Sequence, residues 1–182
     1  MQKAEILLAG LGGQGIQSAG DILARACTRA GMHVALLPSY GAEARGTLIR
    51  SELVVSDEEI VYPGVLEPDV FVAFSQQAYD YFLTAVTPDT MIFYDSASVT
   101  PAAGDSSSVR HYPIPAMEVA SEAGNEKAAN MVMLGAVAAS SDLIPMDGLK
   151  EMLSKGPKKR AETSVAAQEK GFELASQQLR CR

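Results

Sequence analysis

The sequence predicts an α/β domain with a Rossmann-like, mostly parallel sheet, helices on both faces and a helical C-terminal part. Three observations predict this fold. A short apolar run at 6–9 leads into the glycine-rich segment 10–15, and a helical pattern follows it. A second apolar run at 34–37 comes after that helix at the distance of an ordinary β-α-β unit, which favours parallel strands. Because no internal repeat or linker interrupts the 182 residues, we expect a single domain over 1–182.

The spacing of apolar residues predicts the other elements of the N-terminal half. The first helix is expected to stop at Gly31, and the strand at 34–37 is expected to be buried and to end at Pro38. Residues 47–56 alternate between apolar and polar side chains, which is typical of a half-exposed strand that is antiparallel or near an edge. Further on, the pattern predicts a buried strand at 70–74, a helix over 76–85 and a strand at 91–94 that ends in Asp95.

The C-terminal half is predicted to be mainly helical. A surface loop at 97–108, rich in Ser, Ala, Pro and Gly taken together, and a short strand at 109–112, closed by Pro113 and Pro115, precede it. The helices are then predicted in order: a buried one over 130–139, a short one over 146–154, and, after a break at 156–160, an amphipathic one over 161–178.

Composition excludes several classes of partner. The net charge of -7 and the pI of about 4.8 argue against nucleic acid or an anionic membrane as the main partner, since both require a basic surface. No apolar run approaches the roughly 20 residues of a membrane span, and we see no signal peptide. Cys27 is expected in a helix core and Cys181 in an exposed tail, so neither predicts a disulfide, an iron–sulfur cluster or zinc. A reducing cytoplasm fits best.

The glycine-rich segment is the first candidate site. Gly10, Gly12 and Gly15 stand as G-x-G-x-x-G, with Gly13 and Gln14 between them. The first glycine is expected to turn the chain off the strand, the second to leave room for a phosphate, and the third to let helix and strand pack closely. Backbone N–H groups at the helix start would then form an anion site. A tight turn that binds no ligand is equally compatible with the motif.

The end of the second strand argues against a nicotinamide cofactor. Dinucleotide-binding proteins place an Asp or Glu there to hold the ribose hydroxyls. Here the strand ends in Leu36-Leu37-Pro38-Ser39-Tyr40, and the first acid is Glu43, beyond the turn.

The segment after that strand is the second candidate site. It lies where open α/β sheets bind ligands, and it brings together a hydroxyl, an aromatic face and two opposite charges. Its candidate residues are Ser39, Tyr40, Gly41, Glu43, Arg45 and Gly46. The alternative is a surface loop whose charges are simply solvated.

These residues resemble a known family. The glycine turn followed by Ser39-Tyr40-Gly41-x-Glu43-x-Arg45-Gly46 is similar to the gamma subunit of the 2-oxoacid:ferredoxin oxidoreductases. Ile60-x-Tyr62-Pro63 and Ala73-Phe74-Ser75-Gln76-x-Ala78-Tyr79 resemble the 2-oxoglutarate-type chain most, and Asn130-Met131-x-x-Leu134-Gly135-Ala136 resembles the buried helix of the family. The resemblance covers residues 4–175. Thr47 departs from it, because the family usually has a second glycine there.

The resemblance implies a subunit rather than an autonomous enzyme. The family oxidatively decarboxylates a 2-oxoacid and passes the acyl group to coenzyme A and the electrons to ferredoxin. Thiamine diphosphate, Mg²⁺ and iron–sulfur clusters belong to the other chains, which are alpha and beta subunits and in some cases a ferredoxin-like delta subunit. On this chain the resemblance implies no catalytic residue and no metal ligand. It implies a coenzyme A phosphate contact at the glycine turn, and at the second candidate site a contact with either the pantetheine arm of coenzyme A or a neighbouring subunit.

Two alternatives to this subunit hypothesis stay open at this point. One is a free-standing nucleotide- or flavin-binding reductase, and the other is a purely structural partner that binds nothing. Copies of the isolated chain are also expected to be able to pair through the Met-rich helical half. His33 and His111 are interpreted as structural. The roles of Asp95, Lys158, Lys159 and Arg160 are left open between ligand contacts and structural or solvated positions.

Overall fold

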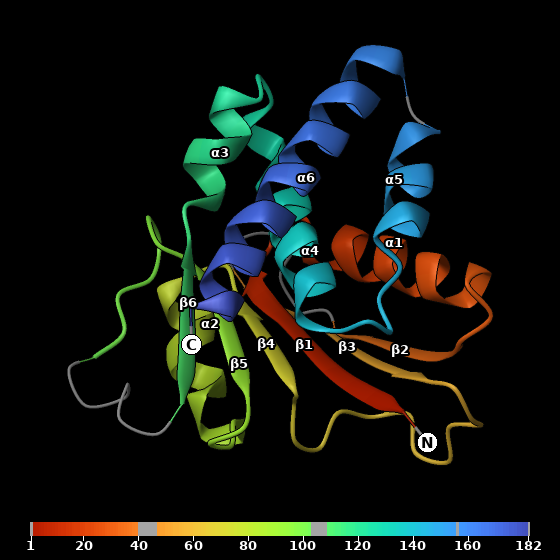
Figure 1. Ribbon diagram of the computed structural model, residues 1–182. Coiled ribbons are helices and arrows are strands. Elements are labelled where there is room, and N and C mark those ends of the chain that lie inside the picture. Colours follow the sequence, from red (N-terminus) through yellow and green to blue (C-terminus); the bar gives the residue numbers. More distant parts are fainter. Residues whose placement is uncertain (1, 40–46, 103–108, 156, 182) are drawn as a thin grey trace.

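The protein is built on a six-stranded mixed sheet, seen in a computed structural model that describes residues 2–39, 47–102, 109–155 and 157–181 (Figure 1). The strand order is β2-β3-β1-β4-β5-β6. β1, β4, β5 and β6 pair in parallel, while β3 is antiparallel to both β1 and β2. The mostly parallel sheet is therefore confirmed. The strands are β1 (Lys3–Leu11), β2 (His33–Ser39), β3 (Leu48–Ser56), β4 (Val70–Ala73), β5 (Met91–Asp95) and β6 (Arg110–Ile114).

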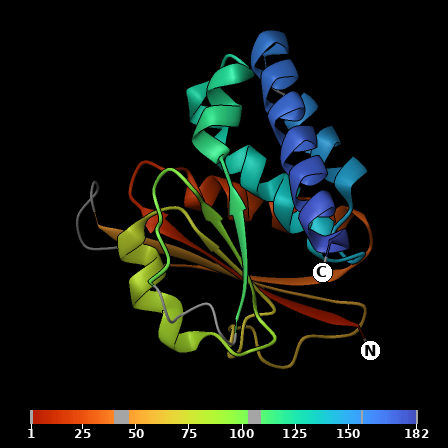
Figure 2. The same ribbon diagram turned by 60° about the vertical axis from the view of Figure 1, so that its left-hand side comes forward.

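Helices cover both faces of the sheet, as predicted. On one face lies α2 (Gln76–Phe82), which continues into η1 (Leu83–Ala85), and the other helices lie on the opposite side (Figure 2). These are α1 (Ile16–Arg29), α3 (Ala116–Glu122), α4 (Ala129–Ser140), α5 (Met146–Ser154) and α6 (Lys158–Arg180), with η3 (Glu126–Ala128) before α4. No helix in the described ranges is both long and apolar enough to cross a membrane.

The main correction concerns the second strand. The sequence predicted a buried strand at 34–37, but β2 is a half-exposed edge strand, and β3 lies between it and β1. The antiparallel prediction for β3 is confirmed. Its half-exposed character holds only for the first part, because Leu53–Ser56 are buried.

Prolines do not end the edge strands. β2 continues past Pro38 to Ser39, and β6 includes Pro113 and runs to Ile114. Both strands lie at an edge of the sheet, where a residue without an N–H group leaves no neighbouring carbonyl unpaired.

The helical layer is held together by a close crossing of α4 and α6. A Cβ on Gly135 would lie 2.0 Å from the Gln168 carbonyl oxygen, and one on Gly171 would lie 1.9 Å from that of Val132. Only glycine permits this approach. The predicted buried helix at 130–139 is confirmed, and α6 begins earlier than predicted, directly after Pro157. Cys27 is buried and Cys181 is exposed, as expected.

Candidate functional site

The candidate site lies at the carboxyl ends of β1 and β4. From β1 the chain crosses through α1 to β2 on one side, and from β4 it crosses through α2 to β5 on the other side, over the opposite face. Ligands of open α/β sheets bind at such a divergence of connections. A cavity of about 580 Å³ opens there. Its lining includes Gly13, Gln14, Gly15, Ser18, Phe74, Asp95, Met117, Glu126, Lys127, Asn130 and Arg160.

The glycine turn differs in detail from the expectation. β1 runs through Gly10 to Leu11, so the chain does not turn at Gly10. A side chain is instead excluded there, because a Cβ would lie 2.5 Å from Gln14 Oε1 and 2.9 Å from Phe74 Cβ. The Gln14 amide bridges the two strands: its Oε1 accepts from the Leu11 N–H at 2.6 Å and its Nε2 donates to the Phe74 carbonyl at 2.8 Å.

Gly15 joins the turn to the helical layer. Its φ of 76° is in the left-handed region, and a Cβ on it would lie 2.4 Å from Asn130 Nδ2. Asn130, buried at the start of α4, donates to the Gly15 carbonyl at 3.2 Å. The third glycine thus packs against α4, whereas the sequence predicted close packing of helix and strand.

Some backbone N–H groups of the glycine turn already donate hydrogen bonds within the protein and are therefore less suited to an anion. The Gly12 N–H donates to the Thr47 carbonyl at 3.0 Å, and the Gln14 N–H donates to the Leu11 carbonyl at 3.1 Å. Intrahelical bonding in α1 starts with the Ala19 N–H, which donates to the Gly15 carbonyl, and no side chain caps the helix. The N–H groups of the first turn of α1, beside Gly13 and Gly15, therefore form the part of the motif that suits an anion.

Two basic side chains border the same cavity. Lys127 from η3 and Arg160 from the first turn of α6 line it, and both are exposed. Asp95 also lines it, but its carboxylate has a structural role: Oδ1 accepts from the N–H groups of Ala116 and Met117 at 3.0 and 3.3 Å. Exposed Glu126 is the other acid at the rim.

The second candidate site is described only at its ends. Tyr40, Gly41, Glu43, Arg45 and Gly46 lie outside the described residues. Ser39 and Thr47 flank these residues. Ser39 is hydrogen-bonded to α1, and Thr47 is hydrogen-bonded to the glycine turn. The Ser39 carbonyl accepts from Gln17 Nε2 at 3.1 Å, and the Thr47 carbonyl accepts from the Gly12 N–H. Both ends of the segment are therefore anchored beside the glycine turn.

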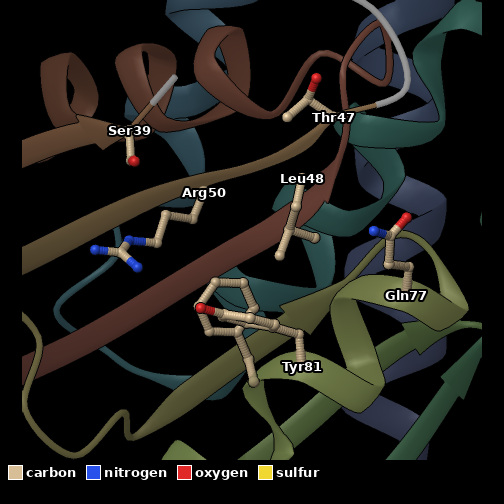
Figure 3. A pocket seen from close by; sticks show the side chains of 7 residues that line it. Ser39, Thr47, Leu48, Arg50, Gln77 and Tyr81 are labelled. Carbon is tan, nitrogen blue, oxygen red and sulfur yellow. The ribbon is translucent and has the colours of Figure 1, made fainter. Parts of the chain in front are cut away.

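Ser39 and Thr47 line a second cavity rather than the first. This cavity of about 580 Å³ lies between β3 and α2, on the face opposite α1 (Figure 3). Leu48 and Arg50 border it from the strand, and Gln77, Tyr81 and Phe82 border it from α2. The Arg50 guanidinium lies 5.9 Å from the centre of the Phe82 ring and pairs with Glu52.

Sequence reasoning missed three contributors to the first cavity: Ser18, Asn130 as a neighbour of Gly15, and Lys127. Asn130 had a usable signal, since a polar residue opens an otherwise apolar helix. Lys127 had none, because its position depends on how α4 packs against α1. His111, interpreted as structural, is buried in β6 and its Nε2 lies 2.7 Å from the Tyr79 hydroxyl.

A comparison with known protein families identifies the family of this chain. The pyruvate ferredoxin/flavodoxin oxidoreductase family model matches residues 5–174. The chain belongs to this family. Among its relatives is the 2-oxoglutarate synthase subunit KorC of Methanocaldococcus jannaschii, 38% identical over 178 residues that cover 96% of this chain and 95% of the relative.

Solved structures of the family share the fold of this gamma-type chain. The gamma subunit of a keto/oxoacid ferredoxin oxidoreductase from Geobacter sulfurreducens superposes with a TM-score of 0.84 at 28% identity, covering 96% of this chain and 97% of that one. The 2-oxoglutarate:ferredoxin oxidoreductase of Magnetococcus marinus, with 2-oxoglutarate, coenzyme A and succinyl-CoA bound, gives a TM-score of 0.88 at 33% identity and 97% coverage. This chain spans 32% of that longer chain.

The full-length relatives are subunits of larger oxidoreductases. Of the hypotheses left open by the sequence, a non-catalytic gamma subunit of a 2-oxoacid:ferredoxin oxidoreductase is therefore supported over a free-standing reductase. Within the described ranges, no group of three His, Cys, Asp or Glu side chains is placed to hold a metal ion.

Proposed function

We propose that this chain is the gamma subunit of a 2-oxoglutarate:ferredoxin oxidoreductase, and that its glycine-turn cavity holds phosphate groups of coenzyme A. The choice of 2-oxoglutarate as substrate rests on the match to a 2-oxoglutarate synthase subunit over nearly the full length of both chains. The Magnetococcus marinus enzyme, which contains coenzyme A, supports the second part.

The chemistry of the cavity fits a phosphate-bearing ligand. The first turn of α1 offers backbone N–H groups and the positive end of a 14-residue helix. Lys127 and Arg160 add two positive charges from the far wall of the cavity. The volume of about 580 Å³ holds part of a coenzyme A molecule. The rest of the ligand, including its thiol, is then left to reach the catalytic chains.

The remaining chemistry belongs to partner subunits in this proposal. Thiamine diphosphate with Mg²⁺, held by those subunits, would supply the decarboxylation of the 2-oxoacid, and their iron–sulfur clusters would carry its two electrons to ferredoxin. This chain has two cysteines, too few for the four thiolates of one cluster. Its partners are the alpha and beta chains and, where one exists, the ferredoxin-like chain. The segment Tyr40–Arg45 is proposed to face the pantetheine arm of coenzyme A or a neighbouring subunit.

The coenzyme A role is tested on the complex purified through a tag on this chain. Lys127→Ala and Arg160→Ala are each expected to raise the KM for coenzyme A by roughly tenfold, the loss of about one charge-assisted contact. The KM for 2-oxoglutarate should stay unchanged. Lys158→Ala removes a neighbouring exposed charge that does not line the cavity and is the matched control. If the KM for coenzyme A is unchanged in both variants, the coenzyme A role is refuted, and the alternative of a purely structural subunit remains.

The substrate is tested on the same preparation. Oxidation rates with 2-oxoglutarate, pyruvate, 2-oxoisovalerate and indolepyruvate are compared at saturating coenzyme A. We expect the highest kcat/KM with 2-oxoglutarate. A preference for another 2-oxoacid would refute the proposed substrate and leave the subunit assignment intact.

A further inference from the structure

The exposed apolar side chains of this protein gather on one side of the sheet. The described residues include six exposed large hydrophobic side chains, and five of them belong to β2, α2 or the loop between β3 and β4. They are Leu37 (42% exposed), Val61 (96%), Tyr62 (55%), Leu66 (66%) and Tyr81 (62%). We call these five the α2-side surface. The sixth, Met117, lines the glycine-turn cavity.

The sheet register places these residues on the side that carries α2. Leu36 packs into the core beneath α1, so its neighbour Leu37 faces the opposite side. The loop is fixed over that side by two carboxylates. Glu5 Oε2 accepts from the Leu66 N–H at 2.7 Å, and Glu52 Oε2 accepts from the Val65 N–H at 3.3 Å. Apolar side chains on a loop held in place bind with little loss of conformational entropy.

Charge gives this surface a distinct character. No Lys or Arg stands between Arg50 and Arg110, whereas ten Asp and Glu residues do. Glu59, Glu67 and Asp80 are exposed beside the apolar side chains. The two basic side chains at this face of β1 and β3 are each paired with an acid, Lys3 with Glu5 and Arg50 with Glu52. The α2-side surface therefore has an apolar centre and an acidic border.

The cavity between β3 and α2 makes the centre concave. Gln77 and Tyr81 of α2 lie on one side of it, and Leu48 and Arg50 of β3 lie on the other (Figure 3). Phe82 also lines the cavity, and its ring centroid lies 4.9 Å from that of Tyr81. The cavity combines two aromatic rings with the polar side chains of Ser39, Thr47 and Gln77. Aromatic residues and Arg in a concave site are typical of the centre of a protein interface. On the opposite face, α1 and α4 cover the sheet, and Met117 is the one exposed large hydrophobic side chain there among the described residues.

We propose that the α2-side surface docks a catalytic partner chain of the complex, through an apolar patch on that chain bordered by Lys and Arg. The inference rests on the proposed function. The acidic border selects a basic partner, and opposite charge raises the association rate while excluding a second acidic copy of this chain. In the Magnetococcus marinus enzyme the equivalent region is 32% of a longer chain, so there it is covalently joined to further protein. Relatives of about this length are separate subunits, and a separate subunit needs a surface for that contact.

The test uses the tagged chain and its partner chains. Tyr81→Glu and Leu66→Glu place a charge in the apolar centre, and each is expected to weaken partner binding by roughly tenfold or more. The double charge reversal Glu59→Lys/Glu67→Lys should weaken binding and reduce its dependence on salt. The controls are Ala166→Glu and Glu122→Lys, both exposed on the helical side. Since all these positions are exposed, each isolated variant should melt like the wild type.

The outcomes separate this inference from the proposed function. If the wild-type complex oxidises 2-oxoglutarate and both centre variants assemble like the wild type, the inference is overturned and the proposed function stands. If the centre variants block assembly of a complex that oxidises no 2-oxoacid, the surface is confirmed and the proposed function fails. If the variants abolish only self-association of the isolated chain, the surface binds a second copy and the inference is wrong.

Discussion

Gly15→Ala gives the sharpest test of how the glycine turn is held, because the chain contains a matched control. Gly15 and Gly31 have similar backbones, with φ of 76° and 86°. A Cβ on Gly31 would meet nothing within 4 Å, whereas one on Gly15 would lie 2.4 Å from Asn130 Nδ2. Gly31→Ala therefore isolates the cost of the left-handed backbone, and Gly15→Ala adds the steric conflict.

The two costs can be estimated separately. An alanine in the left-handed region loses about 1–2 kcal/mol, and this applies to both variants. At Gly15 the Asn130 amide must also move by about 1 Å to restore ordinary contact, since 2.4 Å falls that far short of 3.4 Å. That movement breaks the hydrogen bond to the Gly15 carbonyl and disturbs a buried side chain, for a further ~1–2 kcal/mol.

Urea unfolding measures the difference, and a double-mutant cycle assigns it. Gly15→Ala is expected to lose ~1–2 kcal/mol more than Gly31→Ala, or roughly 2–8 °C more in Tm for a chain of this length. In an Asn130→Ala background the two glycine substitutions should have equal effects, because the conflict is gone. Equal losses in the wild-type background, or a difference that persists without Asn130, would refute the proposed role of Asn130.

Three further predictions concern the rest of the fold. Burial raises the pKa of Glu5, but hydrogen bonds from Lys3 and from the loop N–H groups outweigh burial and lower this pKa overall, so the ionised carboxylate stabilises the fold above pH ~4.5 and this stabilisation is lost as the pH falls further. In urea unfolding, Glu5→Gln should therefore lower the free energy of unfolding by about 1 kcal/mol at pH 7 and by little at pH 3, and an equal loss at both pH values would contradict this role. Burial raises the pKa of the Cys27 thiol to about 12, so iodoacetamide at pH 8 should modify exposed Cys181 alone in the native chain and both thiols in urea, as mass spectrometry would show. Alanine is a better helix former than glycine by about 1 kcal/mol, yet Gly171→Ala should lower the Tm, because a Cβ 1.9 Å from the Val132 carbonyl oxygen forces α4 and α6 apart. A raised Tm in a thermal melt would show that the two helices are not closely packed at this crossing.

Local patterns predicted the elements around the site well, because their causes are local. The apolar run before Gly10 and the helical spacing after Gly15 follow from periodicity within about 20 residues. The small apolar residues of α4 are buried on all sides, and that helix was predicted within one residue at each end. The same reasoning failed at the edges of the sheet, where Pro38 and Pro113 are tolerated.

Strand pairing could not be read from the sequence, because it is decided by contacts distant along the chain. The β-α-β spacing correctly gave β1 and β2 the same direction, yet it cannot exclude a third strand between them. β3 lies there because its apolar positions satisfy both neighbours, with Leu53 paired to Ile6 on one side and Leu36 on the other. The alternation that suggested an exposed strand reflects how little of the α2 side is covered at Arg50 and Glu52.

Apart from Arg160, which was left open as a ligand contact, the sequence predicted only the glycine-turn wall of the candidate site. The glycine turn carries a recognisable spacing, whereas Lys127, Asn130 and Arg160 reach the cavity from more than a hundred residues further along. Their approach depends on the crossing of α4 with α6, which is fixed by Gly135 and Gly171. Two glycines in separate helices give no local signal of a shared contact.

The two faces of the sheet suit different binding partners, and this difference connects the proposed coenzyme A site with the proposed docking surface. On its helical side, the first turn of α1 and the basic side chains Lys127 and Arg160 suit a small anionic ligand. On the α2 side, an apolar and acidic surface suits a large basic partner. The two sides meet at the glycine turn, where the Gly12 N–H and Gln17 side chain hold the ends of the segment 40–46. A partner docked on the α2 side that also covers Ser39 and Thr47 would lie next to the glycine turn, the arrangement that transfer of an acyl group to coenzyme A between chains requires.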